Sequence, residues 1–440
     1  MLKLNKIFYL LILLFISLIF LIKIYENFSS FSNYVNFNEL LINYEGGFIR
    51  RGLIGQLALI FFKNFDIKLE IFFNIFFSIS NGIFILLYLT TINKFRKNIY
   101  LYTTLILSPA TLMFIFYDSL NFFNSQVFLV ISILLHSFIA LKFFNNFKIY
   151  KNCLFFIIIP LLCLNIIVYD VQILFIFSHI IISIILLKNN NQKSTSSLLI
   201  YLLILIPTFF ILTNSGSSTN QEAIQIMKNS IENNFGALID EHPESFNMSM
   251  DHGGNLNLKI GGMIKIFGIY FNYNEKLNLF LGFLLSIFFF YIIFAYFIDK
   301  KIYSFKIDYK TIFILTIPSF SIFLFVTDFG RSVFMVLIHL IAIFSLLRIN
   351  YDQQEKFLKK ISFVKKNIII LFIFIYANFW TLTHSLGWLS VINPSPALVG
   401  IKHSSLMNEM KKITFYSYVV VDEYFLELPK ADFMIPYLKK

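Results

Sequence analysis

Long apolar runs alternate with short polar breaks along most of this chain. Eleven runs come close to the roughly 20 residues that a helix needs to cross the hydrocarbon core of a bilayer. They cover residues 7–22, 71–92, 99–117, 122–141, 152–169, 171–187, 197–213, 277–298, 311–327, 332–347 and 367–385. The pattern therefore predicts an all-α fold, a polytopic transmembrane bundle of about 11 helices.

Six of these helices form three pairs whose members are separated by only a few residues. Asp118, Asp170 and Asp328 each interrupt an apolar run that is about twice as long as one crossing. The basic residues that bracket the three runs are Lys97 and Lys142, Lys151 and Lys188, and Lys310 and Arg348. Each run is therefore predicted to be a helical hairpin with its aspartate at the tip.

Composition supports a membrane environment. The chain is 58% hydrophobic and only 14% charged, with a mean hydropathy of +0.75, whereas soluble domains contain about 25% charged residues. Its two cysteines, Cys153 and Cys163, lie in one apolar run. Neither a disulfide framework nor a thiolate metal site is expected from them.

The charge distribution predicts an orientation. With the N-terminus in the cytoplasm, the inner loops carry 20 Lys and Arg against 4 Asp and Glu, and the outer segments carry 16 against 20. This is the asymmetry of the positive-inside rule. The net charge of +12 therefore reflects topology, and no nucleic-acid partner is expected. The N-terminus is predicted inside and the C-terminus outside.

The predicted organisation places the larger polar segments outside. It comprises a first transmembrane helix (1–24), a first outer loop with an amphipathic helix (25–70), transmembrane helices 2–7 (71–213), a large outer loop (214–276), transmembrane helices 8–11 (277–385) and an outer tail (386–440). In the large loop, a capping box from Thr219 to Glu222 precedes Ile224, Met227 and Ile231 at helical spacing. These residues predict an amphipathic helix on the membrane surface or the bundle.

The first outer loop contains the most informative motif, residues 44–52, which read Tyr-Glu-Gly-Gly-Phe-Ile-Arg-Arg-Gly. Glycines before a helix leave backbone N–H groups open to phosphate, and arginines add bidentate donors. Gly46, Gly47, Arg50 and Arg51 therefore predict an anion site in the first turn of the following helix. Alternatively, Glu45 neutralises the arginines, or the arginines bind lipid phosphates of the outer leaflet.

Each tip aspartate also has two interpretations. It can cap the returning helix, or the three acids can line one polar cavity, since charge is costly beside hydrocarbon. Arg331, three residues after Asp328, is spaced for a local ion pair or for contact with a substrate.

The histidines divide into two groups. His136, His179 and His339 lie in predicted helices without a zinc-binding pattern, so they are expected to be buried and hydrogen-bonded. His242 and His252 lie in the large outer loop, where they can approach a cavity or serve the structure alone.

The layout resembles the GT-C superfamily of membrane glycosyltransferases. In that layout a first helix precedes an outer loop with an acid and amphipathic segments, and a second acid follows helix three. Glu45 and Asp118 occupy these two places. Residues 46–53, with the later Asp-Phe-Gly-Arg at 328–331, are also similar to uncharacterised membrane proteins associated with bacterial surface polysaccharides.

The resemblance implies a sugar donor on polyprenyl phosphate or diphosphate, a glycan acceptor, and a location in the bacterial cytoplasmic (inner) membrane. Asp118 or Glu45 would be the catalytic carboxylate that activates the acceptor hydroxyl. The implied substrate-binding residues are Arg50, Arg51, Gly46, Gly47, Asp170, Asp328, Arg331 and His252. The first loop lacks an Asp-x-Asp or Glu-x-Asp pair, so a divalent metal is compatible with the site but not specified.

Two other functions remain open. An O-antigen-like polysaccharide polymerase would need the same arginines and a large outer loop. A membrane transporter would carry ionisable residues near the middle of its helices and paired broken helices. The acids of this chain cluster at outer tips instead, which favours the enzyme.

Overall fold

The computed structural model describes residues 2–29, 40–47, 52–96, 99–117, 119–169, 172–190, 221–235 and 329–346, with isolated positions at 205, 319, 367–368, 370–371, 373 and 376. Every regular element in these residues is helical. Four helical stretches are long and apolar enough to cross a membrane: Tyr9–Phe28, Leu69–Phe95, Phe147–Val168 and Gln172–Asn189. The described chain is therefore an all-α protein built for a membrane.

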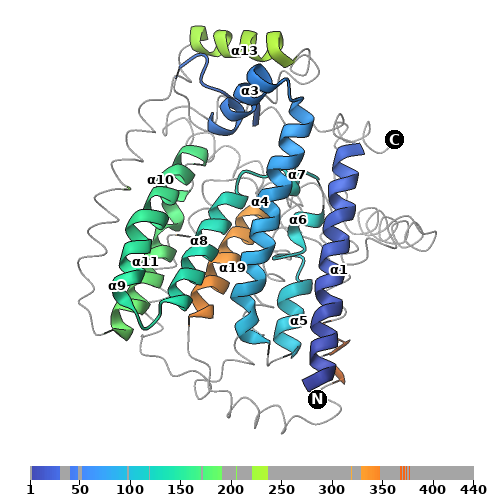
Figure 1. Ribbon diagram of the computed structural model, residues 1–440, viewed down its shortest axis with the longest axis vertical. Helices are drawn as coiled ribbons and strands as arrows, with labels where there is room; N and C mark the ends of the chain where they lie inside the picture. Colours follow the sequence, from blue (N-terminus) through green and yellow to red (C-terminus); the bar gives the residue numbers. More distant parts are fainter. Residues whose placement is uncertain are drawn as a thin grey trace, which may run out of the picture.

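The helices run alternately between two ends of a bundle (Figure 1). α1 (Leu2–Ser29) starts at the end that we call the N-terminal end, and α4 (Leu69–Ile92) returns to it from the opposite, upper end. The others are α5 (Ile99–Leu107), α6 (Phe114–Tyr117), α7 (Ser119–Phe122), α8 (Val127–Lys142), α9 (Phe147–Cys153), α10 (Ile159–Val168), α11 (Gln172–Asn189) and α19 (Phe329–Ser345). A π-helical segment, Leu154–Ile158, joins α9 to α10.

Polar contacts tie the helix ends together at the N-terminal end. Lys94, just after α4, donates to the carbonyl of Ser345 at the end of α19. The side chain of Asn190, just after α11, donates to the carbonyl of Phe144 at 3.1 Å. The ends of α4, α8, α11 and α19 are thereby held side by side, as the alternating directions require.

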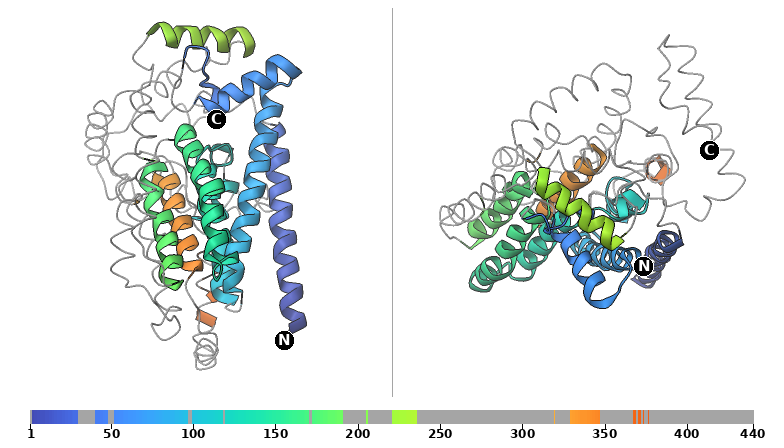
Figure 2. Two further views of the ribbon diagram at one scale, coloured as in Figure 1. Left: turned by 60° about the vertical axis from the view of Figure 1, so that its left-hand side comes forward. Right: turned by 90° about the horizontal axis from the view of Figure 1, so that it is seen from above.

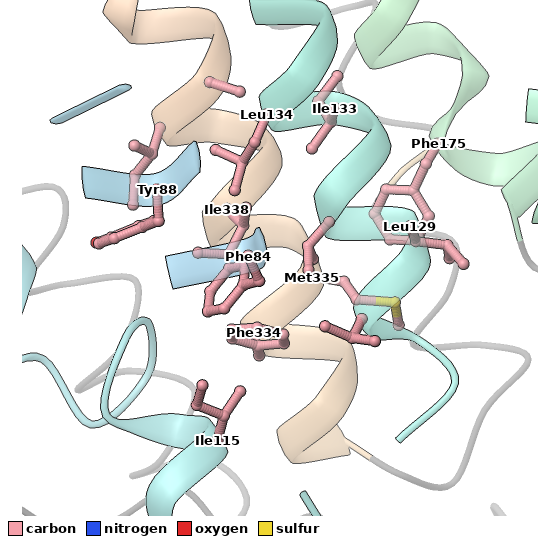
Figure 3. Close-up of a cluster of buried hydrophobic side chains, with 14 of the residues drawn as sticks. Phe84, Tyr88, Ile115, Leu129, Ile133, Leu134, Phe175, Phe334, Met335 and Ile338 are labelled. Atoms are coloured by element: carbon pink, nitrogen blue, oxygen red, sulfur yellow. The ribbon is translucent and has the colours of Figure 1, made fainter. Parts of the chain in front are cut away.

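The centre of the bundle is α8, which contacts α4, α10, α11 and α19. Its core includes Phe84 of α4, Leu129 and Ile133 of α8, and Phe334 of α19, each at most 2% exposed (Figure 3). The Phe334 ring stacks on Phe114 at 4.6 Å and meets Phe84 edge-on at 5.6 Å. Close packing of this kind drives helix association where lipid removes the hydrophobic contrast.

α4 shows how these helices divide their surface. Its outward stripe is aliphatic and 42–66% exposed, and consists of Ile71, Ile75, Ile79, Ile83 and Leu86. Its inward stripe is aromatic and fully buried, and consists of Phe73, Phe77, Phe84 and Tyr88. An apolar stripe of this length needs lipid rather than water around it, so α4 has one face for the bilayer and one for the bundle.

The segment between α5 and α6 breaks the helix inside the bundle. Pro109 has no N–H, so it cannot bond the carbonyl of Leu105 four residues earlier. The hydroxyls of Tyr88 and Thr111 donate to that carbonyl instead, at 2.7 and 3.0 Å. The break is therefore stable in an apolar environment because other side chains satisfy the freed backbone group.

Two further helices lie across the upper end: α3 (Leu53–Phe65) and α13 (Gln221–Phe235) (Figures 1 and 2). α13 contacts α3, and its Met227 and Ile231 are each at most 1% exposed. The amphipathic helix predicted from these two residues is confirmed, although its capping residue Thr219 lies outside the described residues.

The predicted crossings compare well with the observed helices, with one correction. Predicted spans 71–92, 122–141, 152–169, 171–187 and 332–347 correspond to helices within a few residues, and 7–22 is extended to Leu2–Ser29. Span 99–117 is not continuous, because Pro109 ends α5 at Leu107. Spans 197–213, 277–298, 311–327 and 367–385 lie outside the described residues, apart from the isolated positions.

Candidate functional site

A buried polar layer lies where the chain turns between helices at the upper end. The amide of Gln126, just before α8, donates to the hydroxyl of Tyr169 at 2.9 Å. Asn124 supports Gln126 twice: its Nδ2 donates to Gln126 Oε1 at 3.3 Å, and its Oδ1 accepts from the Gln126 backbone N–H at 2.9 Å. We call Asn124, Gln126, Tyr169 and Gln172 the tip layer, because they join the tips of two predicted hairpins.

Gln172 is the distinctive member of the tip layer. It begins α11, its backbone N–H donates to the carbonyl of Tyr169 at 3.0 Å, and its side chain is 0% exposed. Neither Oε1 nor Nε2 has a hydrogen-bond partner in the described part of the chain. An unsatisfied buried amide costs about 1–3 kcal/mol, so this side chain is suited to a ligand that both donates and accepts.

Arg331 is another buried polar residue. It lies in the first turn of α19 and is 8% exposed. Residues three apart share a helix face, so Arg331 lies on the face of Phe334, which stacks on Phe114 of α6. The predicted site residue Arg331 is therefore inside the bundle rather than on its surface.

The three tip aspartates, Asp118, Asp170 and Asp328, lie outside the described residues. Their neighbours still restrict the capping interpretation for one of them. α8 begins at Val127, nine residues after Asp118, and Asn124 accepts the backbone N–H of Gln126 at its start. The helix that directly follows Asp118 in the sequence is the short α7 (Ser119–Phe122), so the capping interpretation of Asp118 concerns α7.

The first outer loop forms a tight turn before α3. The N–H of Gly47 donates to the carbonyl of Tyr44 at 3.0 Å, and Gly47 has a φ of +111°. Only glycine adopts this conformation readily. Gly46 and Gly47 thus form a turn six residues ahead of α3, rather than the start of that helix.

α3 anchors this loop through two contacts. The side-chain oxygen of Gln56 accepts the N–H of Tyr44 at 2.8 Å. Gly55 lies so close to the loop backbone that an added Cβ would stand 2.1 Å from the carbonyl oxygen of Ile42. Residues 40–43 are buried as a result, and the position of Glu45 is fixed through its neighbours.

Glu45 itself points to the surface. Its Oε1 forms an ion pair with Nζ of Lys63 at 3.1 Å, and both side chains are more than one third exposed. Such an exposed ion pair contributes only about 0–1 kcal/mol to stability. Lys63 therefore does not prevent the Glu45 carboxylate from contacting another group. Beside it, burial raises the pKa of Tyr44 to about 12.

The anion-site prediction needs one correction. α3 begins at Leu53 with Gly52 as its N-cap, so Arg50 and Arg51 precede the helix and are not in its first turn. The partner of Glu45 in the structure is Lys63. Arg50, Arg51 and His252 lie outside the described residues, so their predicted roles stay predictions.

Glu45 and the tip layer belong to the same end of the molecule. α3 contacts α10, and α10 ends at Val168, next to Tyr169. Within the described residues, no group of three or more His, Cys, Asp or Glu side chains could hold a metal ion.

Sequence reasoning missed most of the tip layer. Gln126, Tyr169 and Gln172 are uncharged and isolated, so no spacing marks them as partners. The one available signal was a glutamine two residues after Asp170, at the start of an apolar run. The chain matches no known protein family, and no similar curated protein or solved structure was found.

Proposed function

We propose that this chain is an integral membrane glycosyltransferase that uses a polyprenyl-phosphate-linked sugar at the outer face of the bacterial cytoplasmic membrane. The observation that carries the proposal is the unpartnered, fully buried amide of Gln172 in the tip layer. A sugar hydroxyl both donates and accepts hydrogen bonds, which is the combination that an amide requires.

The proposed roles divide between charge and hydrogen bonding. Glu45 or Asp118 acts as the general base for the acceptor hydroxyl, while Arg50, Arg51 and Arg331 bind the phosphate of the carrier. Gln172 and the Gln126–Tyr169 pair bind the sugar. Gly46, Gly47, Asp170, Asp328 and His252 complete the site, and polymerisation of repeat units is the related alternative. A divalent metal is not required by these roles.

We further propose eleven crossings with the N-terminus in the cytoplasm. Support comes from the described residues at the N-terminal end, where the charged side chains are Lys94, Arg96, Lys142, Lys148, Lys151 and Lys188. The upper end carries acids and bases in nearly equal numbers, Glu26, Glu45, Asp66, Glu70, Glu222 and Glu232 against Lys23, Lys63, Lys68, Lys228 and Arg331. The excess of basic residues at the N-terminal end agrees with the positive-inside rule, and the proposed orientation has the tip layer and Glu45 on the outer side.

The test is carrier release by the purified protein in lipid nanodiscs. The protein is incubated with polyprenyl phosphates and diphosphates that bear different sugars, together with short glycan acceptors. Release of free carrier is expected with at least one donor, and Gln172→Leu should abolish it. Gln225→Leu, which changes an exposed amide on α13, is the control. No release with any donor would contradict the proposal.

Transport is the second candidate, and two observations favour it. The helix break at Pro109 lies within the bundle, and three histidines meet midway along α8, α11 and α19. Broken helices and mid-membrane ionisable residues are features of transporters. Uptake of an intact sugar phosphate into proteoliposomes, without carrier release, would favour this function over the enzyme.

A further inference from the structure

His136 of α8 and His179 of α11 are joined through their rings at the centre of the bundle. Their Nδ1 atoms are 3.0 Å apart, and the rings are within 16° of parallel. Both side chains are 0% exposed. The sequence prediction that His136, His179 and His339 are buried and hydrogen-bonded is confirmed for all three, but the direct contact of His136 with His179 was not predicted.

The contact continues toward the N-terminal end. Nε2 of His136 lies 2.8 Å from the hydroxyl of Tyr150, which lies 2.9 Å from Oγ of Ser183. Ser183 in turn donates to the backbone carbonyl of His179 at 3.2 Å. Tyr150 is the fourth residue of α9, which begins at the N-terminal end. We call His179, His136, Tyr150 and Ser183 the histidine chain.

One assignment of donors and acceptors satisfies every donor of the histidine chain. Ser183 uses its only proton on the carbonyl of His179, so the Tyr150 hydroxyl can donate to Ser183 and accept from Nε2–H of His136. His136 Nδ1 must then accept from Nδ1–H of His179. In this arrangement every donor of the chain has an acceptor, and Nε2 of His179 carries a bare lone pair.

That lone pair has no hydrogen-bond partner among the described residues. His339 of α19 is another titratable group beside His179, with its ring centre 6.2 Å from that of His179. The Nδ1–H of His339 donates to the carbonyl of Met335 at 2.7 Å, so its Nε2 is also a bare lone pair. The titratable groups facing one another here, within the described elements, are the three histidines and Tyr150.

We propose that the histidine chain is a proton relay that connects the middle of the bundle with its N-terminal end. A proton taken up at Nε2 of His179 displaces the Nδ1 proton of that ring to Nδ1 of His136. His136 passes its Nε2 proton to the Tyr150 oxygen, Tyr150 passes its own proton to the Ser183 oxygen, and Ser183 releases its hydroxyl proton on the side of the N-terminal end, where α11 ends six residues later. Each ring gains one proton and loses one, so both end neutral.

The relay is independent of the outer-face chemistry. It gives the protein proton exchange between one side of the membrane and its interior. A bare imidazole nitrogen is a general base, and a connected chain moves a proton without moving a charged side chain through the low-dielectric interior.

The test is hydrogen–deuterium exchange of histidine ring protons, measured by nitrogen-15 NMR on the full chain in lipid nanodiscs. Resonances are assigned with single His→Gln variants. The ring protons of His136 and His179 should exchange about 10-fold or more faster than the ring proton of His339, which is equally buried but outside the relay. All three rings exchanging at one slow rate would overturn the proposal.

Variants sharpen this comparison. Tyr150→Phe removes the hydroxyl and should slow His136 and His179 to the rate of His339. Tyr88→Phe removes a fully buried hydroxyl that bonds only the Pro109 break, and should leave all three rates unchanged. Unslowed exchange in Tyr150→Phe would also reject the relay. The three exchange rates are compared within the unmodified chain, so this comparison decides the matter even where Tyr150→Phe fails to accumulate.

Discussion

Gln126 and Tyr169 are 43 residues apart in sequence, and their side chains are joined by a buried hydrogen bond of 2.9 Å. The bond connects the turn before α8 with the turn before α11, and Gln172 follows Tyr169 by three residues. It therefore fixes the spacing of two helices at the end where we propose that the sugar binds.

Removing one partner of this bond should destabilise the protein. Tyr169→Phe leaves Nε2 of Gln126 without its acceptor in an apolar environment, and we expect a loss of about 1–3 kcal/mol. Thermal unfolding in detergent would measure it. Tyr25→Phe, at a side chain that is 76% exposed, should change nothing. Equal melting temperatures for the two variants would show that the bond does not hold the tips together.

Gly55 is predicted to be intolerant of any side chain. The Cβ of Gly55→Ala would stand 2.1 Å from the backbone oxygen of Ile42, so the loop that carries Glu45 must shift, at a cost of about 1–3 kcal/mol or more. The matched control is Gly82→Ala in α4, whose Cβ would meet only Phe20 at 3.8 Å. That variant should be neutral or more stable by about 0.5–1 kcal/mol.

Variants of Glu45 and Lys63 can distinguish an effect on stability from an effect on catalysis. Glu45→Gln and Lys63→Gln each break the same exposed ion pair, so both should change the unfolding free energy by at most about 1 kcal/mol. If Glu45 is the catalytic base, only Glu45→Gln should lower carrier release, by about 100-fold or more. Comparable activity in the two variants would move the catalytic role to Asp118.

Asp118 is tested by the corresponding amide. Asp118→Asn keeps the size of the side chain and removes its basicity, so a catalytic Asp118 predicts normal accumulation with transfer reduced about 100-fold or more. A purely structural Asp118 predicts a nearly silent Asn variant and a loss of about 1 kcal/mol for Ala. Carrier release and thermal unfolding, measured on the same preparations, distinguish the two.

The orientation can be tested by cysteine labelling in sealed cells. In a background with Cys153 and Cys163 replaced by serine, Asn64→Cys at the upper end should react with an impermeant maleimide. Lys148→Cys at the opposite end should react only after the membrane is opened. Both positions are exposed, so a failure to react cannot be due to burial of the cysteine. The reverse labelling pattern would show that the N-terminus lies outside.

The sequence alone determined the class of the protein and most helix positions in the described part. A crossing needs only sufficient length and apolarity, so α4 and α11 begin and end within two residues of the predicted runs. The turn around Asp170 was predicted for the same reason, since an uninterrupted run from Lys151 to Lys188 is too long for one crossing. Pro109 indicates a helix break in the sequence. The hydroxyls that stabilise the break, those of Tyr88 and Thr111, could not be identified from the sequence.

Only the tertiary structure decided which residues meet. In a soluble helix, the contrast between a polar and an apolar face fixes its rotation. Here both faces are apolar, as the lipid-facing and core-facing stripes of α4 show, so periodicity does not tell which face turns inward. The contacts of Gln126 with Tyr169 and of His136 with His179 depend on that rotation and on which helices are neighbours. They emerged only when the helices were packed.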